Sequence, residues 1–286
     1  MKKSPTFVPG VIALLICAAA TTAVQAQDTL PWVKSSYAKV RLIPGGADSA
    51  AGEKTIRAGV QLQLDDGWKT YWRNPGDSGL PASFDFAGSK NLKAAKVLWP
   101  APHRFTDPYG TSIGYVKEVV FPVLVSPERA DEPIDLDLKL DYAICKDICV
   151  PAEAHLNLKL EPGTANSGVF DPIISRYMSK VPAEASAQSS TLPSVRKAKA
   201  ELDRAAPLIV VDAHFPGGIA GADLFVEGPG TIYIPPPQRK DVGENGGVRF
   251  TIDLGEAVDA TALKGKTLNL TLVSDRGQSE ASWTVD

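Results

Sequence analysis

The chain has 286 residues, with 30 Lys and Arg against 33 Asp and Glu, so its formal net charge is -3. A mildly acidic chain without clusters of basic residues lacks the electrostatic footprint of proteins that bind nucleic acid or anionic lipid, and we expect neither partner. With 44% hydrophobic residues, a chain of this length can bury the cores of one large or two ordinary domains.

A secretory signal peptide is predicted over residues 1–26. Two lysines near the start precede an apolar run from Val11 to Ala20, and small residues follow this run as far as Ala26. Cleavage there would leave 286 - 26 = 260 residues with a net charge near 28 - 33 = -5. No later stretch approaches the roughly 18 to 20 apolar residues of a membrane helix. We therefore expect a periplasmic protein without stable membrane insertion.

A first β-sandwich is predicted within residues 27–162. The period-two alternation of half-buried strands is clearest at 134–142, whose apolar face carries Ile134, Leu136, Leu138, Leu140 and Tyr142. Further strands are predicted at 55–64, 92–99, 116–125 and 154–160, separated by clusters of Pro, Gly, Asp and Asn. Many short strands without long helical segments between them favour an antiparallel sandwich.

The C-terminal part of the chain is predicted to form a second, smaller β-sandwich over residues 207–286. Residues 163–206 come before it and are expected to form a short helix followed by a linker rich in Ala, Ser and Gln. The strands expected in the second sandwich lie near 208–213, 222–226, 231–235, 248–254, 267–274 and 279–285. The chain is thus predicted to be all-β with two sandwiches.

Two cysteines four positions apart, Cys145 and Cys149, are the only ones left after removal of the predicted signal. They lie in the segment YAICKDICVPAEA, between the predicted strands 134–142 and 154–160. An extended strand would hold them roughly 13 Å apart, whereas a disulfide requires Cα atoms within about 7 Å. The chain is therefore predicted to turn between them, and an oxidising compartment favours a disulfide.

Three roles for this pair are open from the residues alone. As a structural staple the bridge would contribute only about 2 kcal/mol, because it closes a loop of about five residues. Short bridges at a surface are the ones that exchange with other thiols, which favours a redox-active pair. Two thiolates can also bind Cu(I), with Cys145 and Cys149 as ligands, whereas zinc requires four ligands. Lys146 would favour a thiolate and Asp147 would oppose it, so either sulfur can be the nucleophile.

An aromatic motif, GWKTYWRNPGDSGLP at 67–81, is the other distinctive segment. Three large aromatic residues within five positions, Trp68, Tyr71 and Trp72, cannot all lie on one buried face. At least one is therefore expected near a surface or against the second sandwich. Arg73 and Asp77 are expected to be solvated or paired locally.

Together with VLWP at 97–100, the Tyr109-Gly110 step and the cysteine segment at 142–154, this motif resembles a known family. The resemblance is to the N-terminal periplasmic domain of the thiol:disulfide interchange protein DsbD and its relatives in the copper-tolerance protein ScsB, over about residues 30–162. The three residues between the cysteines are similar to the ScsB branch, since more separate them in DsbD. The resemblance implies an immunoglobulin-like sandwich, with links to cytochrome c biogenesis and copper tolerance.

The resemblance also implies a function. Cys145 and Cys149 would take electrons from a thioredoxin-like donor and pass them, through mixed disulfides, to oxidised periplasmic proteins. The expected partners are periplasmic thioredoxin-like or disulfide-isomerase proteins and a membrane thiol reductase, and no cofactor is expected. A mobile aromatic cap loop is expected at 100–114, with Phe105 and Tyr109 as candidates, although both could simply pack on the sandwich.

The family's membrane-spanning and thioredoxin-like domains are not recognised in this sequence, so its electrons are expected from another protein. Two alternatives stay open beside the relay. One is a non-catalytic immunoglobulin-like binding module whose disulfide is structural. The other is a Cu(I)-binding copper-tolerance protein.

Overall fold

The structure is a computed structural model that describes residues 30–48, 55–108, 110–161, 168–230, 232–241, 245–255 and 258–286. The predicted signal peptide, residues 1–26, lies outside them. Within the described part the chain is nearly all β, with one α-helix, α1 (Asp171–Met178), and a short 3-10 turn. No helix among these residues has the length and apolarity needed to cross a membrane.

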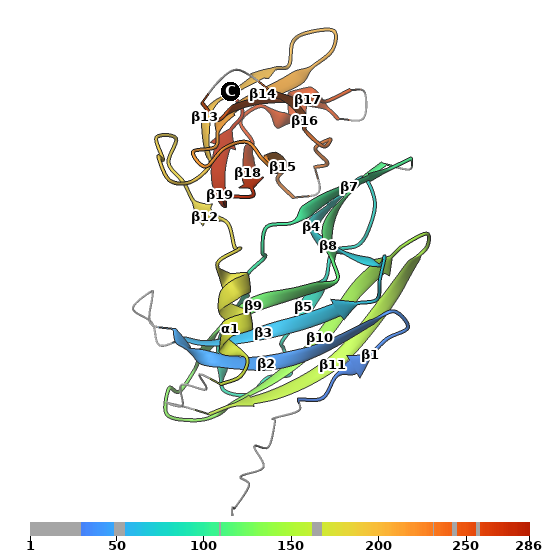
Figure 1. The fold of residues 1–286 in the computed structure, drawn as a ribbon, viewed down its shortest axis with the longest axis vertical. Coiled ribbons are helices and arrows are strands. Elements are labelled where there is room, and N and C mark those ends of the chain that lie inside the picture. The colour runs from blue at the N-terminus through green and yellow to red at the C-terminus, as the bar shows by residue number, and fades with distance from the viewer. Residues whose placement is uncertain are drawn as a thin grey trace, which may run out of the picture.

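Two antiparallel sheets form an immunoglobulin-like sandwich in the N-terminal half, drawn at the bottom of Figure 1. The first sheet has the order β1-β2-β3-β9-β6, with β1 (Val33–Lys34), β2 (Ala38–Asp48), β3 (Thr55–Leu64), β9 (Glu118–Pro127) and β6 (Leu92–Val97). The second has the order β11-β10-β4-β8-β7, with β11 (Cys149–Leu160), β10 (Ile134–Cys145), β4 (Lys69–Gly76), β8 (Gly110–Val116) and β7 (His103–Asp107). A short strand, β5 (Ser83–Asp85), pairs with β10.

The core of this sandwich follows the predicted alternation. Along β10 the side chains at every second position from Ile134 to Tyr142 are buried, and they face the apolar side of the other sheet. Helix α1 lies against β9, β3 and β2 (Figure 1), and its Tyr177 hydroxyl donates to the Glu118 carbonyl at 2.8 Å. The predicted all-β class and sandwich architecture are confirmed.

A second, smaller sandwich lies above the first in Figure 1. One sheet has the order β12-β19-β18-β15, with β12 (Ala183–Glu184), β19 (Gly277–Thr284), β18 (Thr267–Ser274) and β15 (Asp223–Glu227). The other has the order β13-β14-β17-β16, with β13 (Ser194–Glu201), β14 (Leu208–His214), β17 (Gly247–Asp253) and β16 (Gln238–Asp241). Its core is a separate apolar cluster that includes Phe250, Leu270 and Leu272.

The structure differs from the sequence-based expectation in two strands of this sandwich. Strand β13 lies inside 163–206, in the part that is predicted to be a linker after the helix. Its sequence is polar, and it forms an edge strand because it pairs with the buried strand β14. The strand expected at 231–235 does not form over 232–237, and β16 forms after it. Prolines at 235–237 explain this shift, since proline has no N–H to donate to a sheet.

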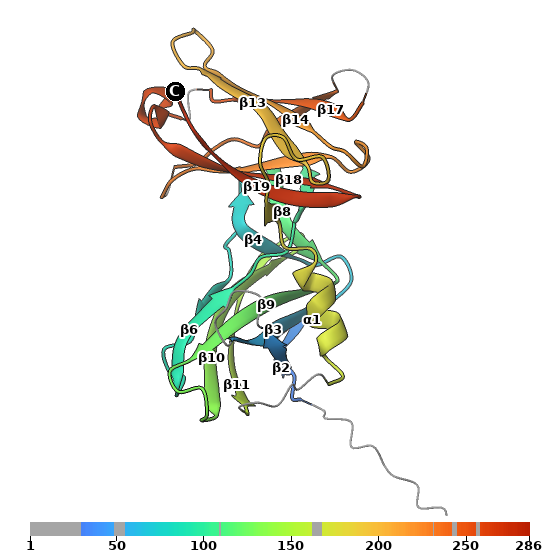
Figure 2. The same cartoon turned by 90° about the vertical axis from the view of Figure 1, so that its left-hand side faces the viewer.

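The two sandwiches share an apolar contact. Phe225 of β15 is only 1% exposed and belongs to the core of the first sandwich, where its ring centroid lies 5.8 Å from that of Trp72 in β4. Figures 1 and 2 both show β4 and β8 projecting from the first sandwich towards the second. One aromatic of the GWKTYWRNPGDSGLP motif therefore meets the second sandwich, as expected.

A buried tyrosine makes the stability of this core sensitive to alkaline pH. The Tyr115 hydroxyl donates to the Pro100 carbonyl at 2.7 Å, and burial raises the pKa of Tyr115 well above its ordinary value of 10.0. In the unfolded chain the phenol ionises near pH 10, while in the folded chain it stays neutral to higher pH. Its contribution to stability is therefore complete below pH 10 and is lost as pH rises towards the folded pKa.

We predict that Tyr115→Phe lowers the free energy of unfolding by about 1 kcal/mol at pH 7, because the Pro100 carbonyl loses its donor. Above pH 10 the wild-type free energy should fall more steeply than that of the variant, by about 1.4 kcal/mol per pH unit. Denaturant unfolding at pH 7, 10 and 11 measures both effects. Parallel pH profiles for the two proteins would contradict the burial argument.

Candidate functional site

The two cysteines face each other across a β-hairpin. Strand β10 ends at Cys145, β11 begins at Cys149, and the two residues are direct partners in the antiparallel ladder. The three residues between them form the turn, closed by a hydrogen bond from the Lys146 N–H to the Ile148 carbonyl at 3.1 Å. The sulfur atoms are bonded as a disulfide. The predicted turn between the cysteines is confirmed.

Strand alternation puts this disulfide outside the main core. Tyr142 and Ile144 point into the sandwich, so Ala143 and Cys145 point to the opposite face of the sheet. There they form a small buried cluster with the ring of Tyr71, a residue of β4. The disulfide therefore lies on the outer face, where another protein can approach it.

The two cysteines differ in exposure. Cys145 is 1% exposed, whereas Cys149, the first residue of β11, is an exposed residue. Thiol-disulfide exchange requires a thiolate to attack a sulfur atom directly, so an external thiol reaches Cys149 before Cys145. Exposure thus favours Cys149 over Cys145 as the nucleophile, a choice that the charges of the loop residues leave open.

Tyr71 contacts the accessible sulfur. Its hydroxyl oxygen lies 3.3 Å from Cys149 Sγ, and because a disulfide sulfur carries no hydrogen, the hydroxyl is the donor in this oxidised state. Burial and, to a smaller extent, the negative charge of Asp107 raise the pKa of Tyr71 above its ordinary value of 10.0. The hydroxyl thus keeps its proton at physiological pH and can also donate to a Cys149 thiolate.

A glycine allows the chain to cover the Tyr71 ring. Gly79 has a φ of +117°, and a Cβ atom there would lie only 2.2 Å from a ring carbon of Tyr71. Any other residue would both strain the backbone and displace the ring. The segment after β4 is therefore shaped to hold Tyr71 against the cysteines.

A lysine occupies the strand next to Cys145. Lys69 pairs with Cys145 in the ladder between β10 and β4. Its ammonium donates to the Ser112 hydroxyl at 2.8 Å, lies 3.6 Å from the Asp107 carboxylate and lies 5.9 Å from the centroid of the Phe105 ring. A positive charge beside a cysteine pair favours a thiolate electrostatically.

The segment predicted to be a cap loop forms strands in the structure. Most of 100–114 forms β7 and β8, a hairpin in which Phe105 pairs with Ser112. Pairing of β8 with β4 on its other side and burial of Ile113 in the core explain why strands form, and Phe105 lies on the outer face. Phe105 lies on the same side of the sheet as Lys69, while Tyr109 lies outside the described residues. The cap role of both residues stays a prediction.

Exposed apolar side chains lie on the segments next to the cysteine pair. Ile148 is 63% exposed and precedes Cys149, while Leu80 is 61% exposed and follows the glycine that covers Tyr71. Val116, also exposed, pairs with Lys69 in the ladder. None of the three is distinctive in the sequence, because the strands that carry or flank them become neighbours only in the fold. Large exposed apolar side chains gathered around a reactive group are typical of a protein-docking surface.

The metal alternative involves the same two sulfurs. Cys145 and Cys149 are the soft ligands that Cu(I) would require, and here they are joined to each other. Within the described ranges, no three His, Cys, Asp or Glu side chains gather as a metal site. His155, in β11, lies 2.6 Å from an Asp137 carboxylate oxygen instead.

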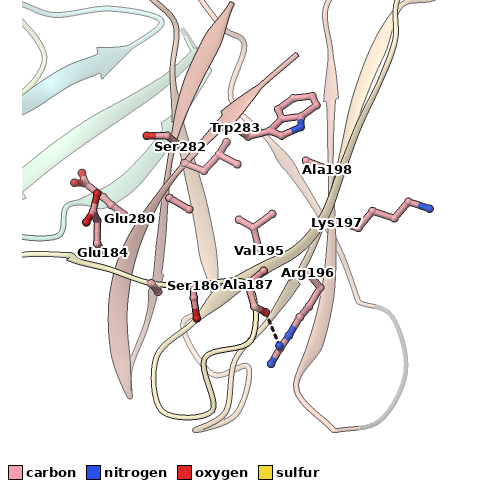
Figure 3. Close-up of a pocket in the computed structure, with 13 residues that line it drawn as sticks. Glu184, Ser186, Ala187, Val195, Arg196, Lys197, Ala198, Glu280, Ser282 and Trp283 are labelled. Atoms are coloured by element: carbon pink, nitrogen blue, oxygen red, sulfur yellow. Dashed lines mark hydrogen bonds between the residues drawn. The ribbon is translucent and has the colours of Figure 1, made fainter. Parts of the chain in front are cut away.

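A cavity of about 690 Å³ lies in the second sandwich, between the sheet edges at β13 and β19 (Figure 3). Val195 and Trp283 give it apolar walls, and the Arg196 side chain donates to the Ala187 carbonyl at its rim. All of its lining residues belong to 184–198 and 270–283. Neither cysteine lines it.

Comparison with known proteins agrees with this geometry. Residues 40–161 match the family model described as thiol:disulfide interchange protein DsbD, N-terminal. The fold is similar to the crystal structure of the N-terminal periplasmic domain of ScsB from Proteus mirabilis, with a TM-score of 0.70 and 23% identity. That match covers 90% of this chain and 97% of the other, so both sandwiches have counterparts there. No curated protein matches the sequence significantly.

We predict that Tyr71→Phe raises the pKa of the Cys149 thiol in the reduced protein by about half to one unit, because a hydrogen bond to a charged group is lost. The rate of iodoacetamide alkylation of Cys149, followed against pH, measures this midpoint. Tyr142→Phe is the matched control, since its hydroxyl donates to Ser35 on the other face of the same sheet. Equal midpoints for all three proteins would show that Tyr71 does not act on the sulfur.

Proposed function

We propose, from the premise that residues 40–161 form a DsbD N-terminal domain, that Cys145 and Cys149 relay electrons by thiol-disulfide exchange in the periplasm. The observation that carries this proposal is the asymmetry of the disulfide. Cys149 is an exposed residue whose sulfur lies beside a hydroxyl donor, and Cys145 is buried. A structural staple would need neither the exposed cysteine nor the donor.

The chemistry proceeds in two exchanges. A thiolate of a reduced thioredoxin-like donor attacks Cys149 Sγ, the bond between the cysteines breaks, and Cys145 leaves as a thiolate that takes up a proton. A second donor thiolate then attacks the donor sulfur of the mixed disulfide, so Cys149 leaves as a thiolate that also takes up a proton. The donor is oxidised to a disulfide, and this chain gains two electrons and two protons.

Electrons leave the reduced pair by the reverse route. The Cys149 thiolate, stabilised by the Tyr71 hydroxyl, attacks the disulfide of an oxidised periplasmic protein and forms a second mixed disulfide. Cys145 loses its proton and attacks Cys149 Sγ, which restores the disulfide and releases the partner as a dithiol. Lys69, on the strand beside Cys145, favours the thiolate at this step.

The partners are proposed to dock on the apolar surface around Cys149. A membrane thiol reductase with a thioredoxin-like domain fits the donor side, and periplasmic thioredoxin-like or disulfide-isomerase proteins fit the acceptor side. Ile148, Leu80 and Val116 offer each of them the apolar contact that a transient interface requires. Because the same sulfur serves both exchanges, donor and acceptor use this surface in turn.

We predict that Cys145→Ser captures partners as mixed disulfides, because Cys149 stays accessible and no second thiol can resolve the complex. Cys149→Ser should capture at least about tenfold less, since the remaining thiol is buried. Non-reducing electrophoresis of periplasmic extracts, followed by mass spectrometry, measures both. Equal capture by the two variants would contradict the assignment of the nucleophile.

The reduction potential of the wild-type pair tests the relay itself. If the potential is too low for exchange with a thioredoxin-like donor, and neither variant captures a partner, the relay proposal fails. A purely structural disulfide would then be expected to lower the free energy of unfolding by about 2 kcal/mol when reduced.

We predict that Ile148→Asp slows reduction of the pair by a thioredoxin-like protein at least about tenfold, because a charge replaces an apolar docking contact. Reduction by dithiothreitol, which needs no docking surface, should change far less. Val169→Asp is the matched control, because Val169 is 81% exposed and lies beside α1. Similar slowing with both reductants would show that the substitution acts on the disulfide and not on docking.

A further inference from the structure

The second sandwich holds the strand that carries Tyr71. Arg73, two residues further along β4, donates from Nε to both carboxylate oxygens of Glu227, at 2.9 and 3.1 Å, and from Nη2 to Glu227 at 2.7 Å. The same Nη2 also contacts the Glu280 carboxylate. One arginine of the first sandwich is therefore paired with two carboxylates of the second, which corrects the expectation that Arg73 is solvated or paired locally.

A second arginine anchors the β7–β8 hairpin in the same way. Arg104 donates to both carboxylate oxygens of Asp223, at 2.8 and 2.7 Å, and to the Leu224 carbonyl at 3.0 Å. Alternation along β7 turns Arg104 towards the second sandwich and its neighbours Phe105 and Asp107 towards the face that carries the disulfide. One side of the hairpin thus contacts β15, and its other side lies beside Lys69.

Asp77 joins the hairpin to the segment after β4. Its carboxylate accepts a hydrogen bond from the Thr111 N–H at 2.7 Å and another from the Tyr233 hydroxyl of the second sandwich. Asn74 adds a bond from its side-chain amide to the Val226 carbonyl at 2.9 Å. Asp77, like Arg73, is therefore a bridging residue between the sandwiches.

We propose that the second sandwich acts as a clamp on the redox site, with Arg73 and Arg104 as positioning residues that fix Tyr71 against Cys149 through β4 and the β7–β8 hairpin. This inference rests on the proposed exchange function. It assigns a role to the second half of the chain, for which the sequence offered none. Neither arginine touches the sulfurs.

Strand β7 is the edge strand of its sheet. It pairs only with β8, whereas β8 also pairs with β4 on its other side, so β7 depends on the second sandwich for further support. Each anchor is a bidentate, partly buried ion pair, in which removal of one partner leaves the other charge partly desolvated and unpaired. Loss of an anchor therefore frees the hairpin, moves Asp107 and relaxes the packing that holds the Tyr71 hydroxyl on Cys149.

The test compares Asp223→Ala with Asp212→Ala in the full chain. Asp212 makes a similar bidentate pair with Arg249, at 2.6 and 3.0 Å, but on the other sheet of the second sandwich. Two readouts are used: amide hydrogen exchange over residues 103–116 in the oxidised protein, and the pH midpoint of Cys149 alkylation in the reduced protein. Neither readout requires a partner protein. The clamp proposal and the relay proposal can therefore be contradicted independently of each other.

We expect Asp223→Ala to speed exchange in the hairpin about tenfold or more and to raise the alkylation midpoint in the same direction as Tyr71→Phe. In a Tyr71→Phe background Asp223→Ala should add no further shift, because both changes act on one hydrogen bond. Asp212→Ala should change neither readout. Arg104→Gln removes the same pair from the other side and serves if Asp223→Ala does not fold.

Three results would overturn the clamp. The first is a wild-type rate of amide exchange and a wild-type alkylation midpoint in both Asp223→Ala and Arg104→Gln. The second is a midpoint shift that persists in the Tyr71→Phe background. The third is faster exchange throughout the second sandwich, which would show that the pair supports folding of that half alone.

Discussion

The register of the β10–β11 hairpin is the constraint on which the rest of the first sandwich depends. Twelve consecutive pairs run from Ile134 with Leu160 to Cys145 with Cys149. Because side chains alternate between faces, the same register that buries the apolar positions of β10 sends Ala143 and Cys145 outward. A slip of one residue would place the sulfur in the core. The large free energy of core burial thus fixes the position of a group that contributes little to stability itself.

The chemistry of the site follows from that placement. On the outer face Cys149 is exposed at the start of β11, next to the turn, while the packing of Tyr71 buries Cys145. This difference favours Cys149 as the cysteine that exchanges with another protein in the proposed relay. The exposed apolar side chains near the turn are proposed to contact the partner, while the cysteines carry out the exchange.

The two halves of the chain are joined by contacts of different kinds. Phe225 enters the first core and makes the junction apolar at its centre, and the arginine pairs surround it. Guanidinium groups suit this position because they form bidentate pairs with fixed direction, so they hold an orientation as well as a distance. The strands that they hold, β4 and β7, are the ones that carry Tyr71 and the hairpin beside the disulfide.

The sequence by itself determined the strand alternation, the turn between the cysteines and the family resemblance, because each depends on residues close together in the chain. It placed strands at 55–64 and 267–274 with the bounds that the structure shows. It missed β13, whose polar sequence becomes a strand only through its buried neighbour, and it read the β7–β8 hairpin as a loop.

Only the tertiary structure decided which sulfur is accessible, that Tyr71 lies on it, and that Arg73 and Arg104 reach the second sandwich. The contacts of Tyr71 with Cys149 and of the two arginines with the second sandwich join residues 78 to 207 positions apart in the chain. The local sequence pattern carries no information on such pairs. Which cysteine is buried, and which carboxylate an arginine binds, depend on how whole sheets pack against each other.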